Sequence, residues 1–230
     1  MNLYILLFSH GTNWSSRATA VGTLLLAGVA IFGGRVYAWY FRPRLKISYS
    51  HSSPDAHKIP VNMFWTGIAG NPWGYSFSPR IHNDGRGPAH NVEVFASRLS
   101  KYDGTDFREM KAFIPKNLSW SQFDEWFAPA ILPNMYRHCN LGVTTDPRDY
   151  PEGMGPRTIL FLTLQGIPNT PGYQITPGLY RLFLKIAAEN INKPVEAIME
   201  MDISGDWFSE EDDMLRQGMK IRLLNHRRRV

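Results

Sequence analysis

The stretch Ile81–Phe95, IHNDGRGPAHNVEVF, decides the expected fold of this 230-residue chain. Its glycine-rich centre, Asn83–Pro88, supplies the backbone freedom that a chain reversal needs. After the reversal, Val92 and Val94 alternate with polar neighbours, which is the period of two of a half-buried strand. We therefore expect a strand, a turn and a second strand.

Similar patterns predict further strands. Tyr180–Ile186 and Val195–Ile203 alternate apolar with charged residues, and the segment Asn190–Pro194 between them has turn composition, so these two strands should form a hairpin. Leu45–Tyr49 predicts the first strand. The apolar run within Arg157–Gln165 predicts a buried one.

Weaker patterns fill the rest of the chain. Tyr75–Ile81 predicts one strand, which Pro79 should place at an edge or at a bulge. Residues 50–74 and 129–155 predict irregular structure, with a possible short strand at Val61–Thr66. The end of the chain predicts a short helix that Ser209 caps and Gly218 ends, and then a strand at 219–223.

The pattern N-x-G-x-x-x-A-x-x-V-x-V, carried by Asn83, Gly85, Ala89, Val92 and Val94, resembles the early hairpin of bacterial immunoglobulin-like modules of the cell-adhesion-related (CARDB) type. The resemblance implies binding or scaffolding, no fixed catalytic site and, more often, a place outside the cell. The high aromatic content, 13%, and the 16 prolines and 19 glycines are also typical of β-rich folds. We expect a mainly β fold: a transmembrane helix followed by an immunoglobulin-like antiparallel β-sandwich with one or two short helices.

An apolar segment near the N-terminus predicts the membrane helix. Ala18–Gly34 carries no charge, and the apolar run continues to Phe41 if Arg35 lies near the interface. A helix over 18–41 would reach roughly 36 Å, enough to cross a ~30 Å hydrocarbon core. A cleaved signal peptide and a buried core helix are the alternatives, but the basic residues follow the apolar run, whereas they precede it in a signal peptide. The residues expected at the membrane interface are Arg35, Tyr37, Trp39, Tyr40, Arg42 and Arg44.

These features divide the chain into an N-terminal tail (1–17), a transmembrane helix (18–41), a β-sandwich domain (42–225) and a basic tail (226–230). Basic residues are denser after the helix than before it, so the positive-inside rule places the C-terminal domain in the cytoplasm, at the cell (inner) membrane. The resemblance points the other way; we follow the charges because they act during insertion. The basic tail is either a solvated end or a contact with anionic headgroups.

The net charge of +5 is concentrated beside the apolar segment and at the C-terminus. This distribution favours membrane lipid as a partner and does not predict nucleic-acid binding, which needs basic residues along a whole face. The single cysteine, Cys139, excludes an intrachain disulfide.

Aromatic residues recur at three- and four-residue spacing in Ser119–Phe127, which predicts a short helix with an aromatic face. Such a stripe either packs in the core or forms a platform for a ligand or a partner. Trp120, Trp126 and Trp207 are the candidates for such a surface.

Catalytic and metal-binding patterns are weak. His82, Asp84 and His90 flank the first turn without the spacing of a usual metal site. His138 precedes Cys139, but sequence neighbours point in different directions. We therefore predict no catalytic, cofactor or metal site, and no enzyme. The expected function is a single-pass membrane-anchored module that binds or scaffolds another protein; the alternative is a membrane-tethered sensor of a small ligand.

Overall fold

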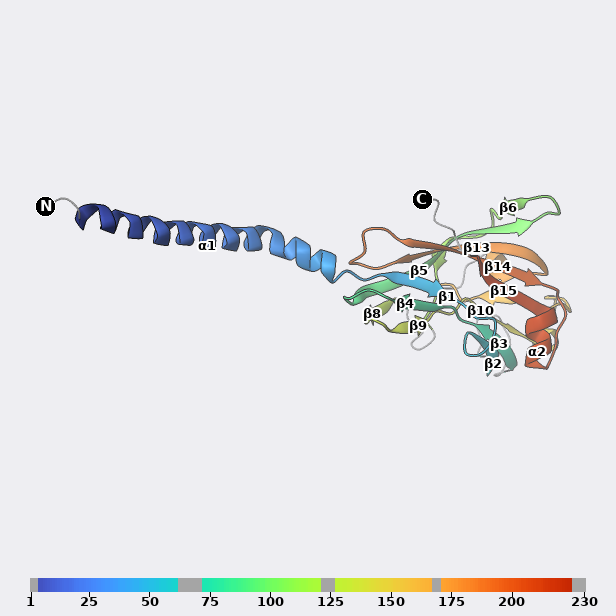
Figure 1. The fold of residues 1–230 in the computed structure, drawn as a ribbon. Coiled ribbons are helices and arrows are strands. Elements are labelled where there is room, and N and C mark those ends of the chain that lie inside the picture. The colour runs from blue at the N-terminus through green and yellow to red at the C-terminus, as the bar shows by residue number, and fades with distance from the viewer. Residues whose placement is uncertain (1–3, 62–71, 121–126, 167–170, 225–230) are drawn as a thin grey trace. The chain divides into compact units, whose positions relative to one another are not determined.

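A computed structural model divides the chain into two compact units, Met1–Arg42 and Pro43–Val230. It describes residues 4–61, 72–120, 127–166 and 171–224 (Figure 1). The first unit is helix α1 (Tyr4–Tyr40), and the second is built mainly from antiparallel strands. The expectation of a mainly β fold that follows an N-terminal apolar helix is confirmed.

Helix α1 begins at Tyr4, earlier than the start expected at Ala18. No proline interrupts residues 4–40, so the polar residues before Ala18 prolong the helix instead of ending it. Within α1, Ala18–Tyr40 has a mean hydropathy of 1.6 and is long and apolar enough to cross a membrane. This segment matches the expected span to within one residue.

The second unit contains three antiparallel sheets among the described residues. The first has the order β1-β4-β9, from β1 (Leu45–Ser48), β4 (Arg80–Asn83) and β9 (Tyr136–His138). The second has the order β12-β11-β10-β3-β2, from β2 (Ala56–Pro60), β3 (Trp73–Phe77), β10 (Gly142–Thr145), β11 (Leu160–Leu162) and β12 (Gln174–Ile175).

The largest sheet has the order β15-β14-β13-β5-β6, and two short strands also pair with β5. Its strands are β5 (Ala89–Tyr102), β6 (Phe107–Glu109), β7 (Lys116–Asn117), β8 (Ala128–Ile131), β13 (Gly178–Ala187), β14 (Val195–Ile203) and β15 (Met219–Leu224). The expected hairpin is confirmed: β13 and β14 pair in register from Gly178 opposite Ile203 to Ile186 opposite Val195.

One hydrophobic core receives side chains from all three sheets, as in a sandwich. The largest sheet contributes the alternating residues that the sequence predicts, such as Val92 and Val94 on β5 and Leu182 on β13. Tyr75 on β3 and Ile81 on β4 enter the same core. Burial of one face of β5 and β13 therefore explains why apolar and polar residues alternate along these two strands.

A β-bulge interrupts β5 in the middle of the largest sheet. Ala96 pairs with Leu184 and Arg98 with Phe183, so Ser97 is an extra residue on β5. The bulge increases the local twist of the strand.

Pro79 acts differently from the expectation. The single strand expected at Tyr75–Ile81 is two strands, β3 and β4, in different sheets. Neither lies at an edge, because β3 is flanked by β10 and β2, and β4 by β1 and β9. Pro79 lacks an N–H and therefore ends one ladder, so the chain passes to a second sheet.

Other expectations need correction. The segments expected to be irregular contain β2, β9 and β10. The short C-terminal helix is α2 (Glu211–Asp213), which continues as a π-helical turn, η4 (Met214–Gly218), and its N-cap is Glu210 instead of Ser209. Single-turn 3₁₀ helices lie at η2 (Pro147–Asp149) and η3 (Pro171–Tyr173). The helix expected at Ser119–Phe127 is not formed at Ser119 and Trp120, because Trp120 forms an antiparallel bridge with Cys139; residues 121–126 lie outside the described residues. Residues 62–66 of the short strand considered at Val61–Thr66 also lie outside them.

Candidate functional site

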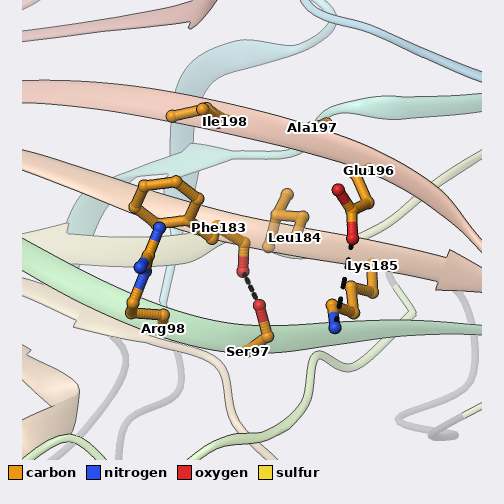
Figure 2. A pocket seen from close by; sticks show the side chains of 8 residues that line it. All are labelled: Ser97, Arg98, Phe183, Leu184, Lys185, Glu196, Ala197 and Ile198. Carbon is orange, nitrogen blue, oxygen red and sulfur yellow. Dashed lines mark hydrogen bonds and ion pairs between the residues drawn. The ribbon is translucent and has the colours of Figure 1, made fainter. Parts of the chain in front are cut away.

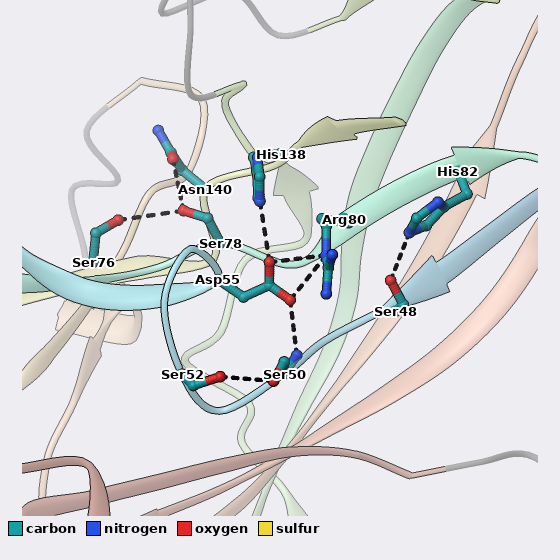
Figure 3. A network of polar contacts seen from close by, with 10 residues as sticks. All are labelled: Ser48, Ser50, Ser52, Asp55, Ser76, Ser78, Arg80, His82, His138 and Asn140. Carbon is teal, nitrogen blue, oxygen red and sulfur yellow. Dashed lines mark hydrogen bonds and ion pairs between the residues drawn. The ribbon is translucent and has the colours of Figure 1, made fainter. Parts of the chain in front are cut away.

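A buried carboxylate joins three segments of the second unit. Asp55 lies just before β2 and has no exposed surface. Its Oδ1 lies 2.9 Å from Arg80 Nε on β4 and 3.1 Å from His138 Nε2 on β9, and its Oδ2 accepts a hydrogen bond of 2.8 Å from the backbone N–H of Ser50 (Figure 3). These donors compensate the free-energy cost of removing the carboxylate charge from water.

Polar side chains occupy the face of the three-stranded sheet above Asp55. The register places Ser48 opposite Arg80, and Arg80 opposite His138. His82 lies opposite Tyr136, and its Nε2 is 2.7 Å from Ser48 Oγ. The Tyr136 ring lies between the two histidines, with ring centres 5.2 Å and 5.6 Å away.

This polar face does not assemble a catalytic triad. A serine and histidine pair needs a carboxylate that orients the histidine. Asp55 hydrogen-bonds to His138, whereas Ser48 contacts His82, and within the described part of the chain no carboxylate hydrogen-bonds to His82. Burial, and then the charge of Arg80, lower the pKa of His82. The face is therefore best explained as a structural junction with a neutral His82.

The outer face of the largest sheet carries a hollow beside the bulge. Its volume is about 320 Å³, and it is lined by residues of β5, β13 and β14 (Figure 2). The Arg98 guanidinium carbon lies 3.8 Å from the centre of the Phe183 ring, and Ser97 Oγ donates a 3.0 Å hydrogen bond to the Phe183 carbonyl. The lining residues are Ser97, Arg98, Phe183, Leu184, Lys185, Glu196, Ala197 and Ile198.

A second stack lies along the same strand. Arg181, two residues before Phe183, has its guanidinium carbon 3.8 Å from the centre of the Phe107 ring. Its Nε donates 2.9 Å to Glu200, which also accepts 2.8 Å from Arg222 Nε. Burial alone would raise the pKa of Glu200, but hydrogen bonds from Arg222 and Arg181 outweigh burial and lower it.

We call Arg98, Phe107, Arg181, Phe183 and Ile198 the cation–aromatic face. Both of its aromatic rings are covered by a guanidinium, and Phe183 and Ile198 are half-buried. Arginine and aromatic residues are enriched where proteins bind proteins, because both offer large contact areas and arginine also donates several hydrogen bonds. This face therefore has the composition of a protein-binding surface.

The residues expected at the membrane interface are divided between the two units. Arg35, Tyr37, Trp39 and Tyr40 lie on α1 with exposed side chains, and Arg42 follows the helix, whereas Arg44 belongs to the second unit.

The three tryptophans proposed as a ligand surface have different surroundings. Trp120 is 2% exposed in the core, and its indole Nε1 has no hydrogen-bond partner among the described residues. Trp207 is half-buried and its ring centre lies 5.4 Å from that of Tyr75. Trp126 lies outside the described residues. A ligand at these tryptophans stays a prediction.

The thiol and metal hypotheses gain no support from the geometry. Cys139 is fully buried, and burial raises the pKa of its thiol. A thiol of this kind is a poor nucleophile. Among the described residues, no group of three or more His, Cys, Asp or Glu side chains could hold a metal ion.

Sequence patterns missed both surfaces described above. The Asp55 junction joins residues far apart in the chain, and no local pattern announces such a contact. The cation–aromatic face did leave a signal. In the strand Tyr180–Ile186, the alternation turns Phe183 outward together with Arg181 and Lys185, and an outward aromatic residue between two cations is unusual in a solvated face.

No protein-family model, curated protein or solved structure matches the chain.

Proposed function

We propose that the chain is a single-pass membrane protein whose β-sandwich domain binds another protein on the cytoplasmic side of the cell membrane. The segment Ala18–Tyr40 supports the anchor, because its length and apolar composition suit a bilayer. Exposed aromatic residues at its C-terminal end, Tyr37 and Trp39, suit an interface.

The distribution of basic residues supports the orientation. Arg17 precedes the span, whereas Arg35 lies at its end and Arg42, Arg44 and Lys46 follow it. Because the denser group is retained on the cytoplasmic side during insertion, the β domain follows it there.

The observation that carries the binding proposal is the hollow beside the Arg98–Phe183 stack. The stack orders both side chains before a partner arrives, so less conformational entropy is lost on binding. A hollow of about 320 Å³ next to it can receive side chains of the partner. We expect Arg98, Phe183 and Ile198 to form the centre of the contact.

Crosslinking in native membranes tests the proposal. A photoreactive amino acid replaces Ile198 in the full-length chain, and a second version places it at Glu152, an exposed residue that does not line the hollow. We expect a discrete adduct of higher mass at 198 and none at 152. An adduct of twice the mass of the chain would identify the partner as a second copy.

A matched pair of variants makes the test specific. Phe183→Ala removes the ring of the stack and should abolish the adduct at 198. Lys220→Ala, on an outward position of the edge strand β15, should leave it unchanged. Absence of an adduct at 198, or an adduct that Phe183→Ala does not weaken, would refute binding at the cation–aromatic face.

A further inference from the structure

The segment Leu132–Tyr136 presents large apolar side chains to the outside; we call it the β8–β9 turn, and it includes the first residue of β9. Leu132 and Met135 are 52% and 55% exposed, and Tyr136 is 47% exposed. Each exposed apolar side chain forgoes the free energy that burial would supply. Three of them within five residues form a small apolar projection, and such clusters mark contact sites.

Hydrogen bonds fix the backbone of this turn. Asn134 has a φ of 59°, and its N–H donates 2.8 Å to the carbonyl of Asn83. The N–H of Asn83 in turn donates 3.0 Å to the carbonyl of Met135, and the N–H of Met135 donates 3.1 Å to that of Leu132. The apolar side chains are therefore held outward by an ordered backbone, which lowers the entropy lost on binding.

The turn lies at the end of the second unit where its chain begins. The N–H of Asp84 donates 2.9 Å to the carbonyl of Arg44, and Asp84 directly follows Asn83, which is bonded to the turn. Because neighbouring strands are ~4.8 Å apart, the backbones of Arg44 and Met135 are separated by about 10 Å. Only three residues of the sequence lie between Tyr40, the last residue of α1, and Arg44.

Exposed charges around this end are mostly basic. The turn between β13 and β14 also lies here, because Asn190 Nδ2 donates 2.8 Å to the carbonyl of Pro88, just after the turn that follows β4. Lys46 forms an ion pair of 2.5 Å with Asp84. The exposed basic residues are Arg44, Lys46, Arg86 and Lys193, and the exposed acidic ones are Asp84 and Glu189. An excess of basic side chains around an apolar projection suits an anionic lipid surface.

We propose that the β8–β9 turn, Leu132–Tyr136, is a second membrane contact, in which Leu132 and Met135 enter the lipid leaflet at which α1 ends. Tyr136 lies at headgroup level, where amphipathic aromatic rings are favoured, and the basic side chains contact anionic headgroups. The proposal rests on the anchorage proposed above. With one covalent and one non-covalent attachment, the β domain cannot rotate freely about its tether.

Site-specific fluorescence tests the contact in the full-length chain. Met135→Cys is labelled with an environment-sensitive fluorophore and reconstituted in vesicles of phosphatidylcholine and phosphatidylglycerol. Labelled wild-type chain gives the background of Cys139, which is fully buried. The control is Thr105→Cys, on the exposed turn that follows the other end of β5. Leu132→Cys serves as a second test position.

We expect the label at 135, and likewise at 132, to emit at shorter wavelength and to be quenched by brominated acyl chains. The label at 105 should emit as in water and be quenched by aqueous iodide. A label at 135 and 132 that behaves like that at 105, or one at 105 that is equally quenched by lipid, overturns the proposal.

Alkaline carbonate extraction of the same vesicles reports on the anchor separately. If the chain resists carbonate extraction but the label at 135 is exposed to water, the turn contact is refuted and the anchor stands. If carbonate releases the chain although lipid quenched the label before extraction, the anchor is refuted and the turn contact stands.

Discussion

Asn83, at the end of β4, holds together the turn that leads into β5. Its Oδ1 accepts hydrogen bonds from the backbone N–H groups of Arg44 and Gly85, both at 3.0 Å. Its Nδ2 donates to the carbonyls of Gly87 and Ile131, at 2.8 Å and 2.9 Å. Two accepted and two donated bonds use this buried amide fully, and an aspartate could not supply the donors.

Replacing Asn83 with alanine removes the partner of four backbone groups. Because these groups are buried or partly buried, we expect the free energy of unfolding to fall by about 3 kcal/mol, measured by urea unfolding of the full-length chain in detergent. The control is Asn190→Ala. The Asn190 amide also makes two hydrogen bonds, but it is exposed, so water can take its place in the variant. The free energy of unfolding of this variant should fall by less than about 1 kcal/mol. Equal losses for the two variants would contradict this role of Asn83.

Glu200 gives the second prediction at this scale. Its pKa is lower in the folded chain than its ordinary value of 4.5, so its ionised form stabilises the fold at neutral pH. This stabilisation is present above the ordinary pKa of glutamate, and it is lost as the pH falls from there through the lowered pKa of Glu200 in the folded chain. We expect Glu200→Gln to be less stable than wild type at pH 7 and to lose less stability on acidification.

Unfolding midpoints measured from pH 7 downward test this prediction. Glu196→Gln is the control, because Glu196 is exposed and lies 4.0 Å from Lys185, a weak ion pair. Parallel pH profiles for wild type and Glu200→Gln would count against the ion pairs with Arg181 and Arg222.

At the scale of single elements, the bulge in β5 lets the strand bury its core side chains and still pair with β13. Ala96 and Leu99 both point into the core, although their separation of three residues breaks the alternation of a regular strand. Ser97 is the extra residue that restores the pairing, and its hydroxyl bonds to the Phe183 carbonyl. The bulge therefore lies where the cation–aromatic face is hollowed.

Deletions within β5 test this account. Removal of Ser97 leaves Ala96 opposite Leu184 and Arg98 opposite Phe183, so every side chain keeps its face and the chain should still unfold cooperatively. Removal of Glu93 cannot be absorbed in this way, because even if the bulge is lost the buried side chains of Val94 and Ala96 turn to the solvent. We expect the second deletion to abolish folding, measured by near-ultraviolet circular dichroism. Equal tolerance of both deletions would contradict the proposed register.

The same physics explains which elements the sequence reveals. The strands β5, β13 and β14 are long and buried on one face, so their side chains alternate visibly. By contrast, β9 has three residues, YRH, and none of them is buried, so it carries no alternating apolar signal. The three residues of β11 are buried throughout, and the apolar run in Arg157–Gln165 was a sufficient signal for that strand.

At the scale of the whole molecule, contacts between distant segments were beyond sequence patterns. The Asp55 junction depends on strand order, since Arg80 and His138 meet only because β4 pairs with β9. The exposed turn Leu132–Tyr136 suggests a membrane contact only because it lies near Arg44 in the fold. The apolar span, in contrast, is a property of consecutive residues, and for that reason it could be predicted directly.

Protease digestion of the full-length chain in sealed vesicles, with the cytoplasmic face outward, tests the central claim most directly. We predict that the protease removes the β domain without lysis of the vesicles and leaves a small fragment that contains Ala18–Tyr40 in the membrane. A β domain that is digested only after lysis would place it on the opposite side. Digestion of the whole chain, with no membrane-embedded fragment, would contradict the anchor itself.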